Sequence, residues 1–157
     1  MTTEPAAFDE QMMSRCIELA RQAKAKGNTA VGSLITIDGN IVAEAEEQTP
    51  AGPARFDHAE MLAVVRACKS LNCRTLPAGT LFTTAEPCFL CAYAIREARI
   101  GRVVIGSPTP HIGAATSRYP ILLASDIPPW GHAPDVLCDV LRQECDALRV
   151  SSASTNP

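Results

Sequence analysis

The stretch Thr84-Ala85-Glu86-Pro87-Cys88-Phe89-Leu90-Cys91 determines how the rest of the chain is interpreted. A proline directly before two cysteines three residues apart is typical of the first turn of a helix, because proline lacks only an N–H that would be unpaired there. Positions i and i+3 lie about 60° apart around a helix axis, so both sulfurs can reach one point. The positive end of the helix dipole also favours the thiolate, which is the form that binds metal.

A second stretch, His58-Ala59-Glu60, completes the predicted site. His58 adds a nitrogen to the sulfurs of Cys88 and Cys91, and three protein ligands with one open position are typical of catalytic zinc. Glu60 is expected to move protons for a water that the Zn²⁺ activates, and not to be a fourth ligand. The combination H-x-E followed by P-C-x-x-C is the general signature of zinc deaminases. The alternative is that the cysteines and the histidine are core residues.

Length and composition indicate one globular domain over residues 1–157, with a core from about residue 8 to residue 150. The formal net charge of −3 gives no electrostatic footprint for nucleic acid. Seven cysteines are an odd number, and the N-terminus has no signal-like apolar stretch, so we expect a cytoplasmic protein. No apolar run is long enough to span a membrane.

Hydrophobic periodicity alternates between helix and strand along the chain. Helices are predicted over 8–26, 58–70, 88–98 and 139–149, and strands over 31–37, 41–46, 80–84, 102–106 and 135–138. The turn Asp38-Gly39-Asn40 predicts a hairpin. On the second helix the predicted buried face consists of Met61, Leu62, Val64, Val65 and Cys68. The proline-rich segment 107–133 is predicted to be a functional or mobile loop. This alternation predicts an α/β fold, a three-layer α/β/α sandwich with a mixed sheet.

The chain resembles the cytidine deaminase-like superfamily, in particular the branch of tRNA-adenosine, guanine and fungal cytosine deaminases. Beyond the metal motif, the resemblance includes Thr29–Ile35, Ala98–Gly106 and Leu141–Leu148, and it extends over nearly the whole chain. It implies a single zinc-dependent deaminase domain with a five-stranded sheet. It also implies a homodimer with active sites near the subunit interface.

Two departures from the family influence the predicted substrate. Glu47 takes a position where family members usually carry an asparagine that contacts the substrate, and an ionised glutamate can only accept hydrogen bonds. The chain also lacks the basic C-terminal cluster of tRNA-acting members, and polyanion binding rests on lysine and arginine. We therefore expect hydrolytic deamination of a small amino-substituted heterocycle such as guanine or cytosine, and nucleic acid is an unlikely partner. The alternatives are a tRNA-adenosine (A to I) deaminase and a non-catalytic zinc-stabilised dimer domain.

Five residues are candidates for substrate binding. Glu47 would accept hydrogen bonds from substrate N–H groups, or else it is one charge in an exposed acidic run. The resemblance implies that backbone groups around Ala59 and Glu86 steady the attacking water and the leaving amine. Phe56 would wall the ring or pack in the core, and Trp130 would close the pocket from the late loop.

Overall fold

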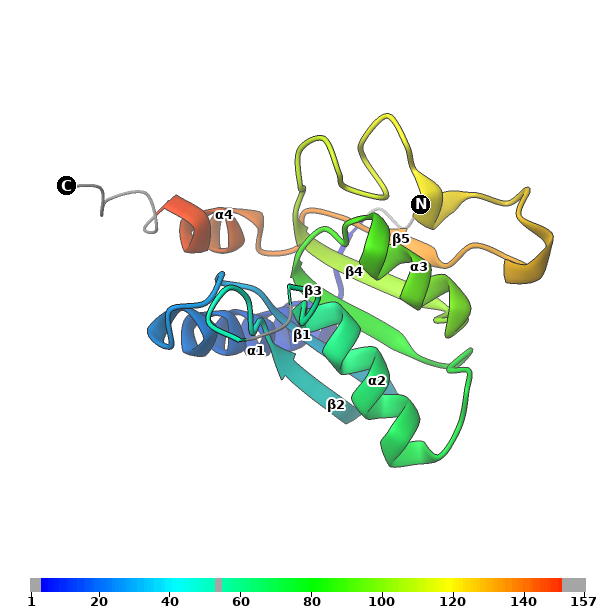
Figure 1. The fold of residues 1–157 in the computed structure, drawn as a ribbon, viewed down its shortest axis with the longest axis horizontal. Coiled ribbons are helices and arrows are strands. Elements are labelled where there is room, and N and C mark those ends of the chain that lie inside the picture. Colours follow the sequence, from blue (N-terminus) through cyan, green and yellow to red (C-terminus); the bar gives the residue numbers. More distant parts are fainter. Residues whose placement is uncertain (1–3, 53–54, 151–157) are drawn as a thin grey trace.

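The computed structural model describes residues 4–52 and 55–150, in which helices and strands alternate as the periodicity predicts (Figure 1). The helices are α1 (Ala7–Ala25), α2 (Ala59–Leu71), α3 (Phe89–Glu97) and α4 (Arg142–Val150). The strands are β1 (Gly32–Ile37), β2 (Asn40–Glu46), β3 (Thr80–Ala85), β4 (Arg102–Ser107) and β5 (Asp135–Leu137). Every predicted element is present, with boundaries shifted by up to three residues.

The five strands form one mixed sheet in the order β2-β1-β3-β4-β5. The strand β1 pairs antiparallel with β2 and β3, whereas β3, β4 and β5 run parallel. The predicted hairpin joins β1 to β2, and its turn residues Asp38 and Gly39 have φ values of 50° and 76°. Positive φ at both central residues gives the turn a twist that matches the twist of the paired strands. The mixed five-stranded sheet is therefore confirmed.

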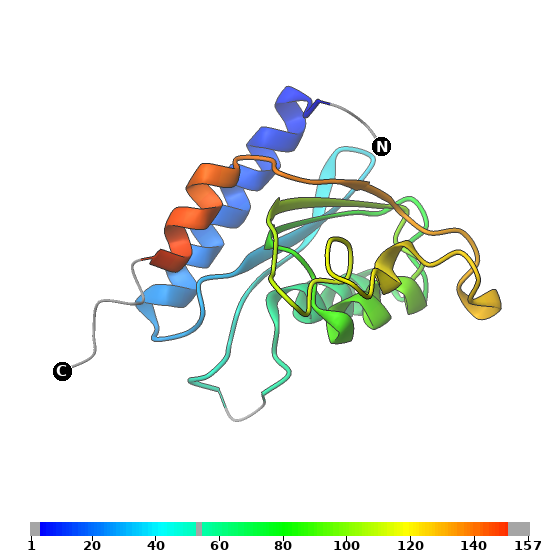
Figure 2. The same cartoon turned by 90° about the horizontal axis from the view of Figure 1, so that it is seen from above.

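Helices cover both faces of the sheet, which confirms the three-layer sandwich. The helices α1 and α4 lie side by side on one face, and α2 and α3 lie on the other (Figure 2). On the α1 side the core includes Met13, Leu34 and Phe82, and on the α2 side it includes Ile35, Leu81 and Ile95. No helix in the described part of the chain is long and apolar enough to cross a membrane.

The predicted buried face of α2 is partly wrong. The buried residues of this helix are Ala59, Glu60, Ala63, Val64 and Ala67, whereas Val65 is 43% exposed. Three of these are alanines, which let the helix backbone approach the sheet closely. Val64 is buried as predicted, and Leu62 and Cys68 pack against the core while partly exposed, so only Val65 turns outward. Hydrophobicity alone favoured the larger residues, because it does not register close packing of small ones.

The long segment after β4 is ordered by a buried arginine. It contains two short 3₁₀ helices, Ile121–Leu123 and Pro128–Trp130. Arg96 of α3 donates to the carbonyl oxygens of Leu122 at 2.9 Å and Ala124 at 2.7 Å. These charge-assisted bonds fix the loop on α3. After β5, Asp139 and Leu141 have positive φ, so α4 begins at Arg142 and not at residue 139 as predicted.

Candidate active site

The three predicted metal ligands lie where two helices begin. His58 is the N-cap of α2 and Cys88 the N-cap of α3, both with extended backbone, and Cys91 follows in the first turn of α3. The strand β3 ends at Ala85 and leads into Cys88. Backbone N–H groups at both helix starts therefore surround the site, and they favour anionic ligands such as thiolates.

The distances between the ligand atoms fit tetrahedral zinc. The sulfurs of Cys88 and Cys91 are 3.7 Å apart, and His58 Nδ1 lies 3.5 Å from Cys88 Sγ and 3.3 Å from Cys91 Sγ. Zinc bond lengths of about 2.3 Å to sulfur and about 2.0–2.1 Å to nitrogen predict about 3.8 Å between sulfurs and about 3.6 Å from sulfur to nitrogen. Within the described ranges no other group of three histidine, cysteine or acidic side chains has this arrangement. The predicted zinc site is therefore present.

The two thiols influence each other's pKa in opposite directions. The hydrogen bond with Cys91 lowers the pKa of Cys88 to about 5, and the same contact together with burial raises the pKa of Cys91. Both sulfurs must be deprotonated to bind a metal, so a divalent cation displaces the remaining proton. This donor set suits zinc, which prefers cysteine sulfur and histidine nitrogen.

Glu60 lies beside the three ligands on the first turn of α2. Its Oε2 is 3.6 Å from Cys91 Sγ, and the side chain is 4% exposed. Burial raises the pKa of Glu60 to about 7, which suits a group that exchanges protons near neutral pH. A structural zinc site has no use for such a carboxylate next to the metal, so the arrangement favours catalysis.

Glu47 is buried and does not belong to an exposed acidic run. Only 4% of the residue is exposed, and burial raises the pKa of its carboxyl group. Its Oε2 accepts a hydrogen bond from the Ala59 N–H at 3.0 Å, and its Oε1 accepts one from the Thr49 hydroxyl. Glu47 thus caps the helix that begins between His58 and Glu60. A carboxylate has about four acceptor positions, so two remain for another donor.

Glu86 is buried and holds the loop after β4. Its carboxylate accepts the N–H groups of Thr109 at 2.9 Å, Ala115 at 2.8 Å and Thr116 at 2.6 Å, and the Thr116 hydroxyl at 2.7 Å. The same loop crosses the metal motif, because the Ala114 N–H donates to the Pro87 carbonyl at 2.9 Å. The carboxylate therefore positions a loop that borders the metal site.

The two aromatic candidates lie in different surroundings. Phe56 is 66% exposed and lies just before His58. Trp130 packs on the C-terminal half of α3, where its indole N–H donates to Glu97 at 2.8 Å and its ring contacts Tyr93. The metal ligands lie at the opposite end of this helix. The roles of Phe56 and Trp130 as substrate contacts stay predictions.

Sequence reasoning missed two tasks that buried side chains perform here, the helix cap by Glu47 and the loop anchor by Glu86. The N–H groups come from the start of α2 for Glu47 and from the loop after β4 for Glu86, and no local pattern shows either contact. The only signal in the sequence was the position of these acids directly before the histidine loop and the cysteine motif.

Comparisons with known proteins agree with this geometry. Residues 6–107 match the family model described as "Cytidine and deoxycytidylate deaminase zinc-binding region". The tRNA-specific adenosine deaminase of Bacillus subtilis (strain 168) is 33% identical over 89% of this chain and 85% of its own length. The protein of the same name from Haemophilus influenzae is 35% identical over 88% of this chain and 79% of its own. A structure solved in a study of A-to-I editing by tRNA:A34 deaminases has a TM-score of 0.81 and 30% identity, and the match covers 88% of this chain and 98% of that one.

These comparisons show that two expectations are wrong: a free nucleobase-like substrate, and nucleic acid as an unlikely partner. Relatives that match most of the chain at 33–35% identity are named for action on tRNA. The physical reason for the error is that net charge sums over the whole chain and does not tell where the charges lie. The missing basic cluster at the C-terminus likewise says nothing about cations elsewhere on the surface.

The family model includes His58, Cys88, Cys91 and Glu60, and it covers well over half of the chain. The three ligand distances independently fit the metal that this family binds. The chain therefore belongs to the cytidine and deoxycytidylate deaminase family, zinc-dependent enzymes that hydrolyse a carbon–nitrogen bond and release ammonia.

Proposed function

We propose that the protein deaminates adenosine to inosine in tRNA. The observation that carries this proposal is the identity of 33% with a tRNA-specific adenosine deaminase, over 89% of this chain and 85% of that enzyme. The similar structure from the study of tRNA:A34 deaminases, with its TM-score of 0.81, supports it. In this reaction water adds at C6 of adenine, the bond from C6 to the amino nitrogen breaks, and the products are inosine and ammonia.

In the proposed reaction Glu60 carries the proton. Its buried carboxylate accepts a proton from the attacking water and delivers it to the leaving amino nitrogen. Zinc held by His58, Cys88 and Cys91 supplies Lewis acidity that makes water nucleophilic near neutral pH. Glu47 fixes the start of α2 by accepting the Ala59 N–H. This bond holds the metal ligand His58 and the proton carrier Glu60 in a fixed position relative to each other.

We further propose that the protein is a cytoplasmic homodimer. None of the seven cysteines forms a disulfide, which suits a reducing compartment. On α2 and α3, Val65, Leu90 and Tyr93 are exposed, and such apolar side chains support an interface between subunits. Light scattering on the purified protein measures the mass directly, and a monomer at micromolar concentration would contradict the dimer.

The substrate is tested with two tRNA transcripts that differ at one nucleotide. One carries adenosine at the wobble position, and the matched control carries guanosine there. We expect inosine in the first transcript, measured by digestion and mass spectrometry, no product from the second, and no product with the Glu60→Gln variant. Ammonia release from free guanine or cytosine without inosine in the tRNA would overturn the proposal.

A further inference from the structure

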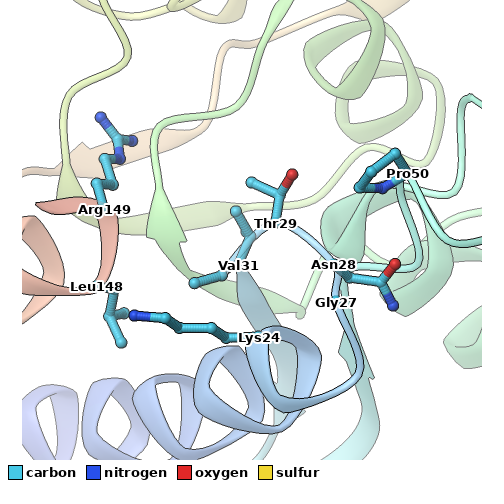
Figure 3. A pocket seen from close by; sticks show the side chains of 9 residues that line it. Lys24, Gly27, Asn28, Thr29, Val31, Pro50, Leu148 and Arg149 are labelled. Carbon is cyan, nitrogen blue, oxygen red and sulfur yellow. The ribbon is translucent and has the colours of Figure 1, made fainter. Parts of the chain in front are cut away.

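A pocket of about 280 Å³ opens where the end of α1, the segment before β1 and the end of α4 meet (Figure 3). This volume is near the lower end of the range for ligand pockets, about 300 Å³. Its lining consists of Lys24, Gly27, Asn28, Thr29, Ala30, Val31, Pro50, Leu148 and Arg149. The pocket combines two cationic side chains and two small polar ones with apolar walls.

Hydrogen bonds connect the wall of the pocket to the active site. The Val31 carbonyl accepts the Glu47 N–H at 2.9 Å, and the Thr29 N–H donates to the Thr49 carbonyl at 2.7 Å. On the other side, the N–H of Gly32 donates to the Thr84 hydroxyl at 3.2 Å, near the end of the strand that leads to the cysteines. The segment with Val31 therefore runs between Glu47 and the strand that leads to the metal motif, and one wall of the pocket is hydrogen-bonded to Glu47.

The charge of this pocket is positive. Its lining includes Lys24 and Arg149 but no aspartate or glutamate. Lys24 is partly buried, and among the described residues it takes part in no salt bridge. A partly buried cation without a carboxylate partner favours an anionic ligand, since its attraction to an anion is less screened there than in open solvent.

The second cation is held in place by the loop that Glu86 anchors. Arg149 donates to the Pro108 carbonyl at 2.7 Å and to the Thr109 hydroxyl at 3.3 Å, and that hydroxyl donates to the Glu86 carbonyl at 2.9 Å. In Figure 3, Lys24 extends from α1 toward Leu148, Arg149 extends from α4 away from Lys24, and Pro50 and Asn28 lie on the other side of the pocket. The position of this guanidinium is thus fixed relative to the metal motif.

We propose that this pocket binds the sugar–phosphate strand of the RNA next to the reacting adenosine. Lys24 contacts a phosphate, the fixed charge of Arg149 adds to the attraction, and the apolar wall of Val31, Pro50 and Leu148 packs against the neighbouring nucleotide. This inference rests on the proposed function, because a free base carries no phosphate that would need these cations. It names a cationic contact outside the metal centre that anchors the strand.

The test compares two charge reversals on the same helix in the zinc-loaded protein. Lys24→Glu changes the pocket, and Arg21→Glu makes the same change of net charge at an exposed α1 position that does not line it. Binding of a fluorescent RNA hairpin, with adenosine in its loop, is measured over a series of salt concentrations. We expect Lys24→Glu to weaken binding on the order of tenfold more than Arg21→Glu. Lys24→Ala should reduce the slope of log K against log salt by about 0.7–1, the loss of one phosphate contact.

The outcomes separate this inference from the proposed function. If the wild type forms inosine in tRNA but Lys24→Glu and Lys24→Ala bind RNA like Arg21→Glu, with an unchanged salt slope, the pocket does not bind the strand and only the inference fails. If the wild type forms no inosine in tRNA, the proposed function fails and the inference falls with it. Zinc content and the unfolding midpoint of each variant show that the protein is folded. Lys24→Ala provides the decisive result should the charge reversal not fold.

Discussion

The buried carboxylate of Glu86 is the most informative side chain to perturb, because it joins the metal motif to the loop after β4. In Glu86→Gln the amide oxygen can still accept the N–H groups of Ala115 and Thr116. The NH₂ group then faces the Thr109 N–H, where two donors meet and one charge-assisted hydrogen bond is lost. The Thr116 hydroxyl can rotate to accept. Losing one such bond and leaving a buried N–H unpaired costs about 1.5–3 kcal/mol.

Urea unfolding of the zinc-loaded protein measures this cost as a lower midpoint at unchanged slope. Asp126→Asn is the matched control, since it removes one negative charge at an exposed position and should shift stability by less than about 0.5 kcal/mol. Gly113→Ala perturbs the same contact from the side of the loop, because the added Cβ would lie 2.4 Å from the Glu86 carboxylate. If Glu86→Gln unfolds at the same urea concentration as the wild type, the carboxylate does not hold the loop as described.

Four further results are expected. Cys88→Ala should abolish binding of about one zinc per chain, and full metal content by elemental analysis would contradict the ligand assignment. Glu60→Gln should retain the zinc but lose about 10²-fold or more in kcat, because an amide cannot carry the proton; near-wild-type turnover would refute its role. Glu47→Gln should keep the zinc and lower kcat/KM about tenfold to a hundredfold, and equal activity on every substrate would remove Glu47 from the site. The Arg102 hydrogen bonds lower the pKa of buried Asp9, so their stabilisation of about 1.5–3 kcal/mol is present above pH 4 and is lost as pH falls through the folded pKa. Asp9→Asn should therefore show a smaller loss of stability on acidification, and an acid transition parallel to that of the wild type would exclude this pair as its source.

The metal site could be predicted because each part of it is local in the sequence. Cys88 and Cys91 are neighbours on the first turn of one helix, and His58 and Glu60 flank the start of another. Only the contact between the starts of α2 and α3 depends on the tertiary structure. A zinc ion with ligands from both helices requires this contact. The strands of the sheet were predictable for a similar reason, because hydrophobic periodicity and turn residues can be recognised within short stretches of sequence.

Features that depend on distant chain segments could not be predicted. The N–H groups that Glu86 accepts come from residues more than twenty positions later, in a loop without periodicity. The outward turn of Val65 depends on how closely the alanines of α2 approach the sheet. Hydrophobicity patterns describe which residues prefer burial, but they do not contain the distance between a helix and its sheet.

The error about nucleic acid has its origin in where the acidic residues lie. The chain has 17 aspartates and glutamates and 14 lysines and arginines, and 14 − 17 gives the net charge of −3. Three of those acids, Glu47, Glu60 and Glu86, are only 4%, 4% and 2% exposed and lie around the metal motif, where they meet backbone N–H groups and the ligands. Asp9 and Arg96 are buried as well, which leaves 13 acids (17 − 4) and 13 bases (14 − 1), so the surface is not acidic overall. Screening limits the reach of exposed charges to about 8–10 Å, so an RNA strand responds to the cations beside the site and not to the sum over the chain.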